Sequence, residues 1–117
     1  AALMTGATLT MERYELPYDN LVTNENLSEA FNENLRSLGI TEITEKKAAG
    51  SSDIGNVSHI TPTIHPYIGI SNCHITPHSR ELADATVTAL GHERLLVGTL
   101  ALAYTGYDVL TNKVNLK

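Results

Sequence analysis

The sequence predicts an α/β fold, a layered arrangement of a few short strands and two main helices in one domain. Three observations predict it. Residues 7–14 and 40–46 alternate between polar and apolar side chains, residues 27–38 carry apolar side chains at helical spacing, and a second, strongly apolar helical stretch follows Gly91. Because strands and helices alternate along these 117 residues, layers of sheet and helix around one modest core are expected.

The first expected strand, residues 7–14, places Leu9 and Met11 on one side and threonines on the other. A turn-rich connector follows, and a helix then begins near Thr23 or Asn24, either of which can cap it. Gly39 is suited to the left-handed conformation that ends a helix. The apolar stripe of this helix comprises Leu27, Phe31, Leu35 and Leu38.

The second half predicts shorter elements and one long helix. Residues 40–46 read as an edge strand, residues 47–58 as a loop that leads into a short helical turn, and residues 67–70 as a buried strand. Residues 79–86 predict one or two helical turns, and a helix from about residue 92 to 110 follows. Since residues 95–104 are apolar nearly all round, we expect this helix to be sandwiched within a core. The small residues that would allow a close approach are Gly98, Ala101 and Gly106.

Composition excludes several classes of protein. The net charge of −5 comes without a basic stripe, so no nucleic-acid partner is expected. The longest uncharged apolar run, residues 95–107, is shorter than the roughly 20 residues that a membrane span needs. A single cysteine, Cys73, forms no internal disulfide and is expected to be a small buried side chain. With no signal-peptide pattern, these features predict a cytoplasmic location. The opening residues read as part of a longer protein.

Four of the five histidines lie between residues 59 and 78. Neither an H-E-x-x-H pattern nor a cysteine pair accompanies them, so this segment does not predict a complete zinc site. One imidazole could instead contribute to a metal site built from distant segments, and His78 is the candidate. The alternative is a solvated loop histidine.

The stretch "GSSDIGN", residues 50–56, has two hydroxyls ahead of Asp53. Its spacing favours a capped turn, in which Ser51 or Ser52 caps a short helix. The alternative is a substrate-contacting loop. The phosphate-binding loop is excluded because no G-K-[ST] follows. Two tyrosines of the long helix, Tyr104 and Tyr107, are expected to pack with their hydroxyls in water.

Three stretches together resemble a known family: "GSSDIGNVSHITPTIHPYIGI", "HSRELADAT" and "GTLALAYTGYDVLTN". They are similar to the C-terminal end of dinuclear zinc amidohydrolases of the aminoacylase/carboxypeptidase type, close to the aminobenzoyl-glutamate hydrolase-like branch. The resemblance implies a piece of a larger phosphorylase/hydrolase-like zinc peptidase catalytic domain. Residues 1–14 would end its lid, or dimerisation, domain, and residues 15–117 would form the C-terminal part of the catalytic domain.

The resemblance also implies chemistry. Members hydrolyse amide bonds of N-acyl amino acids or small peptides with two metal ions, zinc here, and a glutamate general base. His78 matches the last metal ligand, while Ser51, Ser52, Asp53 and, less closely, His65 match residues of the substrate cleft. The other ligands and the general base belong to N-terminal segments that are absent from these residues, so we expect no catalytic residue here and no activity of the chain alone. A homo-oligomer is also expected. The rival interpretation is a non-enzymatic α/β interaction module that self-associates through its apolar helix.

Overall fold

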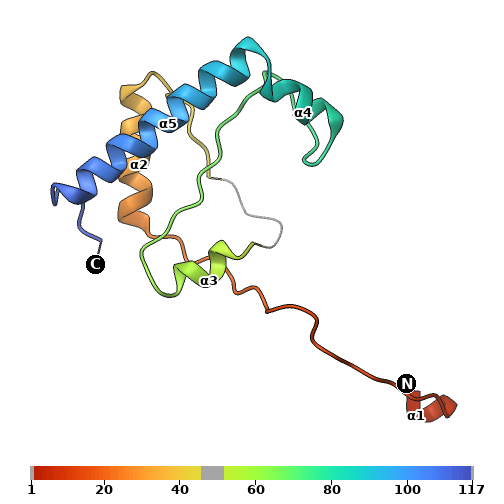
Figure 1. Cartoon of the computed structure of the whole chain (residues 1–117). Helices are drawn as coiled ribbons and strands as arrows, with labels where there is room; N and C mark the ends of the chain where they lie inside the picture. Colours follow the sequence, from red (N-terminus) through yellow and green to blue (C-terminus); the bar gives the residue numbers. More distant parts are fainter. Residues whose placement is uncertain (1, 46–51, 117) are drawn as a thin grey trace.

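The computed structural model describes residues 2–45 and 52–116, and this part of the chain is helical. It contains α1 (Ala2–Thr5), α2 (Glu25–Ser37), α3 (Ile54–Ser58), α4 (Arg80–Thr86) and α5 (Ala89–Leu110). Figure 1 shows α5 lying across α2, whereas α1 stands away from the other helices on a long extended segment. The radius of gyration is 19.4 Å, well above the roughly 13 Å of a compact domain of about 100 residues. Much of the chain therefore lies outside any packed core.

The predicted α/β fold is wrong. No strand forms within residues 2–45 and 52–116, where only an isolated parallel bridge joins Thr23 to Thr63. The segments expected as strands, 7–14, 40–46 and 67–70, run without regular secondary structure and with no neighbouring strand wherever the structure describes them, and residue 46 lies outside the described residues. Alternation of side chains shows which faces a strand could bury, but its backbone N–H and C=O groups need a second strand to pair with. The described chain supplies no such strand.

Helix α2 forms as its sequence predicts. Asn24 is the N-cap, and its side-chain oxygen accepts a hydrogen bond from the Leu27 N–H at 2.9 Å. At the other end Gly39 takes a left-handed φ of 90°. Its N–H donates to the Arg36 carbonyl, and the next N–H, that of Ile40, donates to the Leu35 carbonyl. This is the Schellman arrangement, and the accompanying apolar contact is present because Ile40 packs against the same cluster as Leu35.

The core is the contact between α2 and α5. Phe31 and Leu35 from α2 meet Ala101 of α5, which is fully buried. A larger side chain at position 101 would hold the helices apart, so the expected role of Ala101 is confirmed. Gly98 also faces this side, since a Cβ added there would lie 3.7 Å from Ile68. Partly buried side chains complete the cluster: Leu38, Ile40, Ile43, Ile64, Ile68 and Val97.

Helix α5 begins three residues before the expected start. Thr88 is its N-cap, with a side-chain oxygen that accepts from the Gly91 N–H at 3.0 Å. Gly91 is buried against the end of α4, where an added Cβ would lie 2.8 Å from the Thr86 carbonyl oxygen and closer still to that of Ala85. The expected sandwich is wrong, because α2 covers one face of α5 and the other stays open, with Leu102 56% exposed and Leu110 83% exposed. Gly106 lies on the open side, where an added Cβ would have no atom of residues 2–45 or 52–116 within 4 Å.

No helix within residues 2–45 and 52–116 is long and apolar enough to cross a membrane. The cytoplasmic location and the division of the chain at residues 14 and 15 stay predictions, which the fold does not test.

Candidate functional site: the loop before helix α4

His78 lies at the junction between an irregular loop and α4. The next residue, Ser79, is the N-cap of that helix, and its hydroxyl accepts from the Leu82 N–H at 3.1 Å. His78 itself has a φ of 58°, in the left-handed region that non-glycine residues seldom occupy. That conformation costs about 1–2 kcal/mol, so the capped helix start must hold it. The backbone thus sets the direction of the Cα–Cβ bond from which this exposed imidazole extends.

The carboxylate of Glu81 is hydrogen-bonded at the N-terminus of α4. The pKa of Glu81 is lowered, mainly because its carboxylate accepts a hydrogen bond from its own backbone N–H and also one from the Ser79 hydroxyl. A negative charge in the first turn interacts favourably with the helix dipole. Both effects strengthen the helix start that orients His78.

An open hollow of about 550 Å³ adjoins His78. Tyr67 and Leu82 line it, together with Pro77, Ser79, Ala83 and Thr86. The ring of His65 lies 5.0 Å from that of Tyr67, measured between centroids, at an angle of 36°. Tyr67 therefore contacts His65 and lines the hollow that His78 also lines, while His65 itself is not among the lining residues.

The Ser-Ser-Asp stretch lies elsewhere. Ser51 falls outside the described residues. Ser52 accepts from the Ile54 N–H at 3.3 Å through its hydroxyl, and Asp53 is the exposed N-cap residue of α3, without a side-chain capping bond. The expected short helix is thus present, but its N-cap is Asp53 rather than Ser52, so the serine cap expected from the spacing is not found in the described part of the chain. Figure 1 shows α3 and α4 well apart, and the two helices do not contact each other.

Helix α3 is attached instead to the segment that precedes α2. The Asn56 side chain donates to the Pro17 carbonyl at 3.2 Å and to the Asp19 carboxylate at 3.0 Å. Ser58 accepts from the Val22 N–H at 2.9 Å. The close contact needs Gly55, because an added Cβ would overlap the backbone of Asp19. This glycine of "GSSDIGN" therefore has a packing role.

The described residues do not hold a complete metal site. Across 2–45 and 52–116, no group of three or more histidine, cysteine, aspartate or glutamate side chains comes together in a way that could hold a metal ion. A catalytic zinc takes about three protein ligands, and His78 offers one. We therefore derive no catalytic step from these residues.

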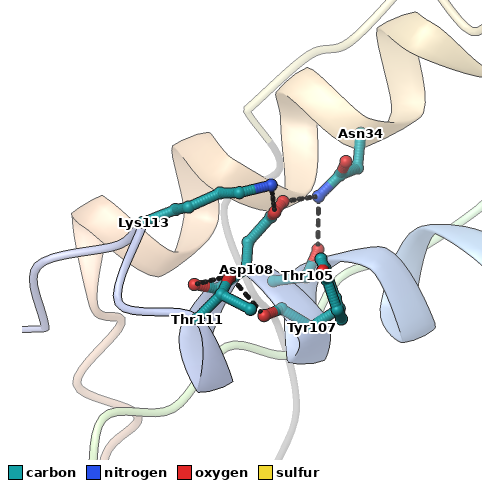
Figure 2. Close-up of polar contacts among 6 residues, drawn as sticks. All are labelled: Asn34, Thr105, Tyr107, Asp108, Thr111 and Lys113. Atoms are coloured by element: carbon teal, nitrogen blue, oxygen red, sulfur yellow. Dashed lines mark hydrogen bonds and ion pairs between the residues drawn. The ribbon is translucent and has the colours of Figure 1, made fainter.

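A polar network between α2 and α5 was not anticipated from the sequence. Figure 2 shows the Asn34 side chain pointing at α5, where its NH₂ group donates to the Thr105 hydroxyl at 3.2 Å and to the Asp108 carboxylate at 3.1 Å. Lys113 lies 3.0 Å from the other oxygen of Asp108. The pKa of Asp108 is lowered, first by the hydrogen bond from Lys113 and next by that from Asn34. The available signal was the spacing of Thr105 and Asp108, which places both on one side of α5.

Two expectations for single side chains are also corrected. Cys73 is exposed rather than buried, and its Sγ lies 3.2 Å from the Ser71 hydroxyl beside an open hollow of about 410 Å³. Tyr107 packs less than expected, because the residue is 61% exposed, with the Lys113 ammonium 5.2 Å from the centroid of its ring.

Comparison with known proteins gives one clear similarity. The chain is 35% identical over 114 residues to the Xaa-Arg dipeptidases of Mus musculus and Homo sapiens. The matched region is 94% of this chain, which spans about a quarter, 26%, of the length of those relatives. No family model matches the chain. No solved structure matches it either. The similarity supports a peptidase-like chain, and the aminobenzoyl-glutamate hydrolase-like branch stays a prediction.

Proposed function

We propose that this chain is the C-terminal part of a metal-dependent peptidase or amidohydrolase, and that it is inactive alone. The observation that carries the proposal is the 35% identity to two dipeptidases over 94% of the chain. The proposed reaction is hydrolysis of an amide bond in a dipeptide or an N-acyl amino acid. The proposed cofactor of the longer protein is a pair of zinc ions.

His78 is the residue that we propose as a metal ligand. Its support is its position at the capped start of α4, where a left-handed backbone directs the exposed side chain beside an open hollow. A neutral imidazole binds zinc through one nitrogen, and a second group commonly orients the ring through the other nitrogen. The chain would contribute this one ligand to a centre completed by other segments.

The proposed substrate contacts differ in their support. His65 is supported by its ring contact with Tyr67, which lines the hollow beside His78. Ser52 and Asp53 rest on the resemblance alone, since α3 lies apart from α4. The mouse and human relatives carry the name Xaa-Arg dipeptidase, so Xaa-Arg dipeptides are the first substrates to assay.

A chimaera tests the proposal. The corresponding region of the mouse relative is replaced by this chain, and Xaa-Arg dipeptide hydrolysis and bound metal are both measured. We expect an active chimaera in which His78→Ala lowers kcat/KM by about 100-fold or more and reduces the bound zinc, because a ligand is lost. His74→Ala, a second exposed loop histidine, is the matched control and should change neither quantity. Full activity and full metal content in the His78→Ala chimaera would refute the role of His78.

A further inference from the structure

The segment that follows α5, residues 111–116, turns back toward α2. Figure 1 shows the C-terminal end of the chain beside the start of that helix. Asn112 makes the turn with a left-handed φ of 57°. Its N–H donates to the Val109 carbonyl at 3.1 Å, and the N–H of Lys113 donates to the Asp108 carbonyl at 2.9 Å. These two bonds form a Schellman arrangement, which ends α5 and sets the direction in which the chain continues.

The Lys113 side chain holds the turn at a second point. Its Nζ lies 3.0 Å from one carboxylate oxygen of Asp108, and the other oxygen accepts from the Asn34 side chain of α2 at 3.1 Å (Figure 2). The turn is therefore linked to α2 through Asp108, in addition to its covalent link to α5.

Two asparagines at the start of α2 bind the far end of the same segment. The Asn26 side chain donates to the Asn115 carbonyl at 2.7 Å, and the Asn24 side chain donates to the Leu116 carbonyl at 3.3 Å. Asn24 is also the N-cap of α2, because its side-chain oxygen accepts from the Leu27 N–H. An amide group has both an acceptor oxygen and a donor NH₂ group, so this one side chain joins the helix cap to the segment.

The burial of side chains along the segment agrees with these bonds. Val114 and Leu116 are partly buried, whereas Asn115 between them is exposed. Alternate burial is expected of an extended segment that lies along a surface, because successive side chains point to opposite sides. A chain end without contacts would expose all three side chains.

We propose that residues 111–116 act as a strap, which closes over the start of α2 and makes the cap of that helix depend on the end of α5. When the strap is closed, Asn24 has a partner on its oxygen and another on its nitrogen, so its amide keeps one orientation. When the strap is open, the Asn24 side chain rotates more freely and the first turn of α2 frays more often. Each bond named above joins two described residues of this chain, so the strap needs no partner, and the inference does not depend on the proposed peptidase function.

NMR of the isotopically labelled chain tests the strap. The heteronuclear NOE reports the order of residues 114–116, and hydrogen exchange of the Leu27 and Ser28 amides reports the opening of the first turn, since both amides donate to Asn24. In the unmodified chain we expect residues 114–116 to have heteronuclear NOE values close to those of α5.

Asn26→Asp removes the donor that binds the Asn115 carbonyl and places a negative charge beside that oxygen. Residues 114–116 should then become disordered, and the amides of Leu27 and Ser28 should exchange about five- to tenfold faster, as expected for the loss of one net hydrogen bond. A carboxylate in the first turn of a helix interacts favourably with the helix dipole. Faster exchange in this variant therefore reports the loss of the strap, since the effect on the isolated helix has the opposite sign.

A matched pair of variants tests the turn at Asn112. Asn112→Val places a β-branched residue at a left-handed φ and should open the strap, whereas Asn112→Gly suits that φ and should leave the strap closed. Asn72→Asp makes the same chemical change as Asn26→Asp at an exposed position of the loop before α4, and this control should change neither measurement.

Far-UV circular dichroism should show nearly the same helix content in every variant, because positions 26 and 112 lie at helix ends. Residues 114–116 that are disordered in the unmodified chain would overturn the proposal. Unchanged order and exchange in both Asn26→Asp and Asn112→Val would overturn it too. Slower exchange of Leu27 and Ser28 in Asn26→Asp would show that the helix dipole, and not the strap, controls the start of α2.

Discussion

Truncation of Leu35 to alanine tests the contact between α2 and α5. Leu35 is 5% exposed, and it packs with Phe31 and Ala101 in the only buried apolar cluster of the described residues. It is also the residue against which Ile40 closes the C-terminal cap of α2. Leu→Ala at a buried site costs about 2–5 kcal/mol, the sum of lost transfer free energy and the cavity left behind.

That loss is large for this chain. Compact domains have free energies of unfolding of about 5–15 kcal/mol, and this cluster is smaller than the core of a compact domain. We therefore expect Leu35→Ala to lower the urea midpoint sharply or to leave α2 and α5 unpaired in water.

The assay is urea denaturation followed by circular dichroism at 222 nm, at a concentration low enough for the monomer. The matched control is Leu3→Ala, the same chemical change at an exposed site, which should stay within about 0.5 kcal/mol of the unmodified chain. If Leu35→Ala also stays within that range, the α2–α5 contact is not what stabilises this chain.

Two further predictions concern charge and close packing. The pKa of Asp108 is lowered by Lys113, so their contribution to stability is present above the unfolded aspartate pKa of about 4 and is lost as pH falls through the folded value. Lys113→Met should flatten this acid dependence, measured as urea midpoints between about pH 2.5 and 7; an unchanged slope would contradict the pairing. Gly91→Ala should destabilise by about 1–3 kcal/mol, because its Cβ would overlap backbone oxygens at the end of α4. At the open position, Gly106→Ala should stabilise the folded chain by up to about 1 kcal/mol. Equal urea midpoints for Gly91→Ala and Gly106→Ala would show that Gly91 is not tightly packed against the end of α4.

The sequence predicted the helices better than the fold. Local signals decide where α2 begins and ends: Asn24 supplies the cap, the apolar stripe supplies the buried face, and Gly39 supplies the left-handed residue. Helix α4 follows from a similar signal, the N-cap Ser79, whereas α3 begins after Asp53, which makes no side-chain capping bond. These interactions join residues that are three or four positions apart, so the sequence of each helix and its flanking residues is enough to predict them.

Sheets and sites depend on more distant partners. Residues 7–14 alternate as a strand would, but the predicted strand does not form because pairing needs a second strand that the described residues lack. The same limit applies to the network at Asn34, whose partners lie 71 and 74 residues further along the chain. The family resemblance singles out His78 among the histidines of its loop, whereas its left-handed backbone at the capped start of α4 was not predicted.

The long extended segment before α2 has a consequence for the life of the chain in a cell. Its side chains include Leu9, Met11, Tyr14 and Leu16, all strongly exposed on backbone that no neighbouring strand protects. Chaperones and proteases act on segments of polypeptide that expose both apolar side chains and peptide bonds. The abundance of the free chain should therefore depend on two competing rates, the rate at which chaperones and proteases bind this segment and the rate at which another strand pairs with it and shields it.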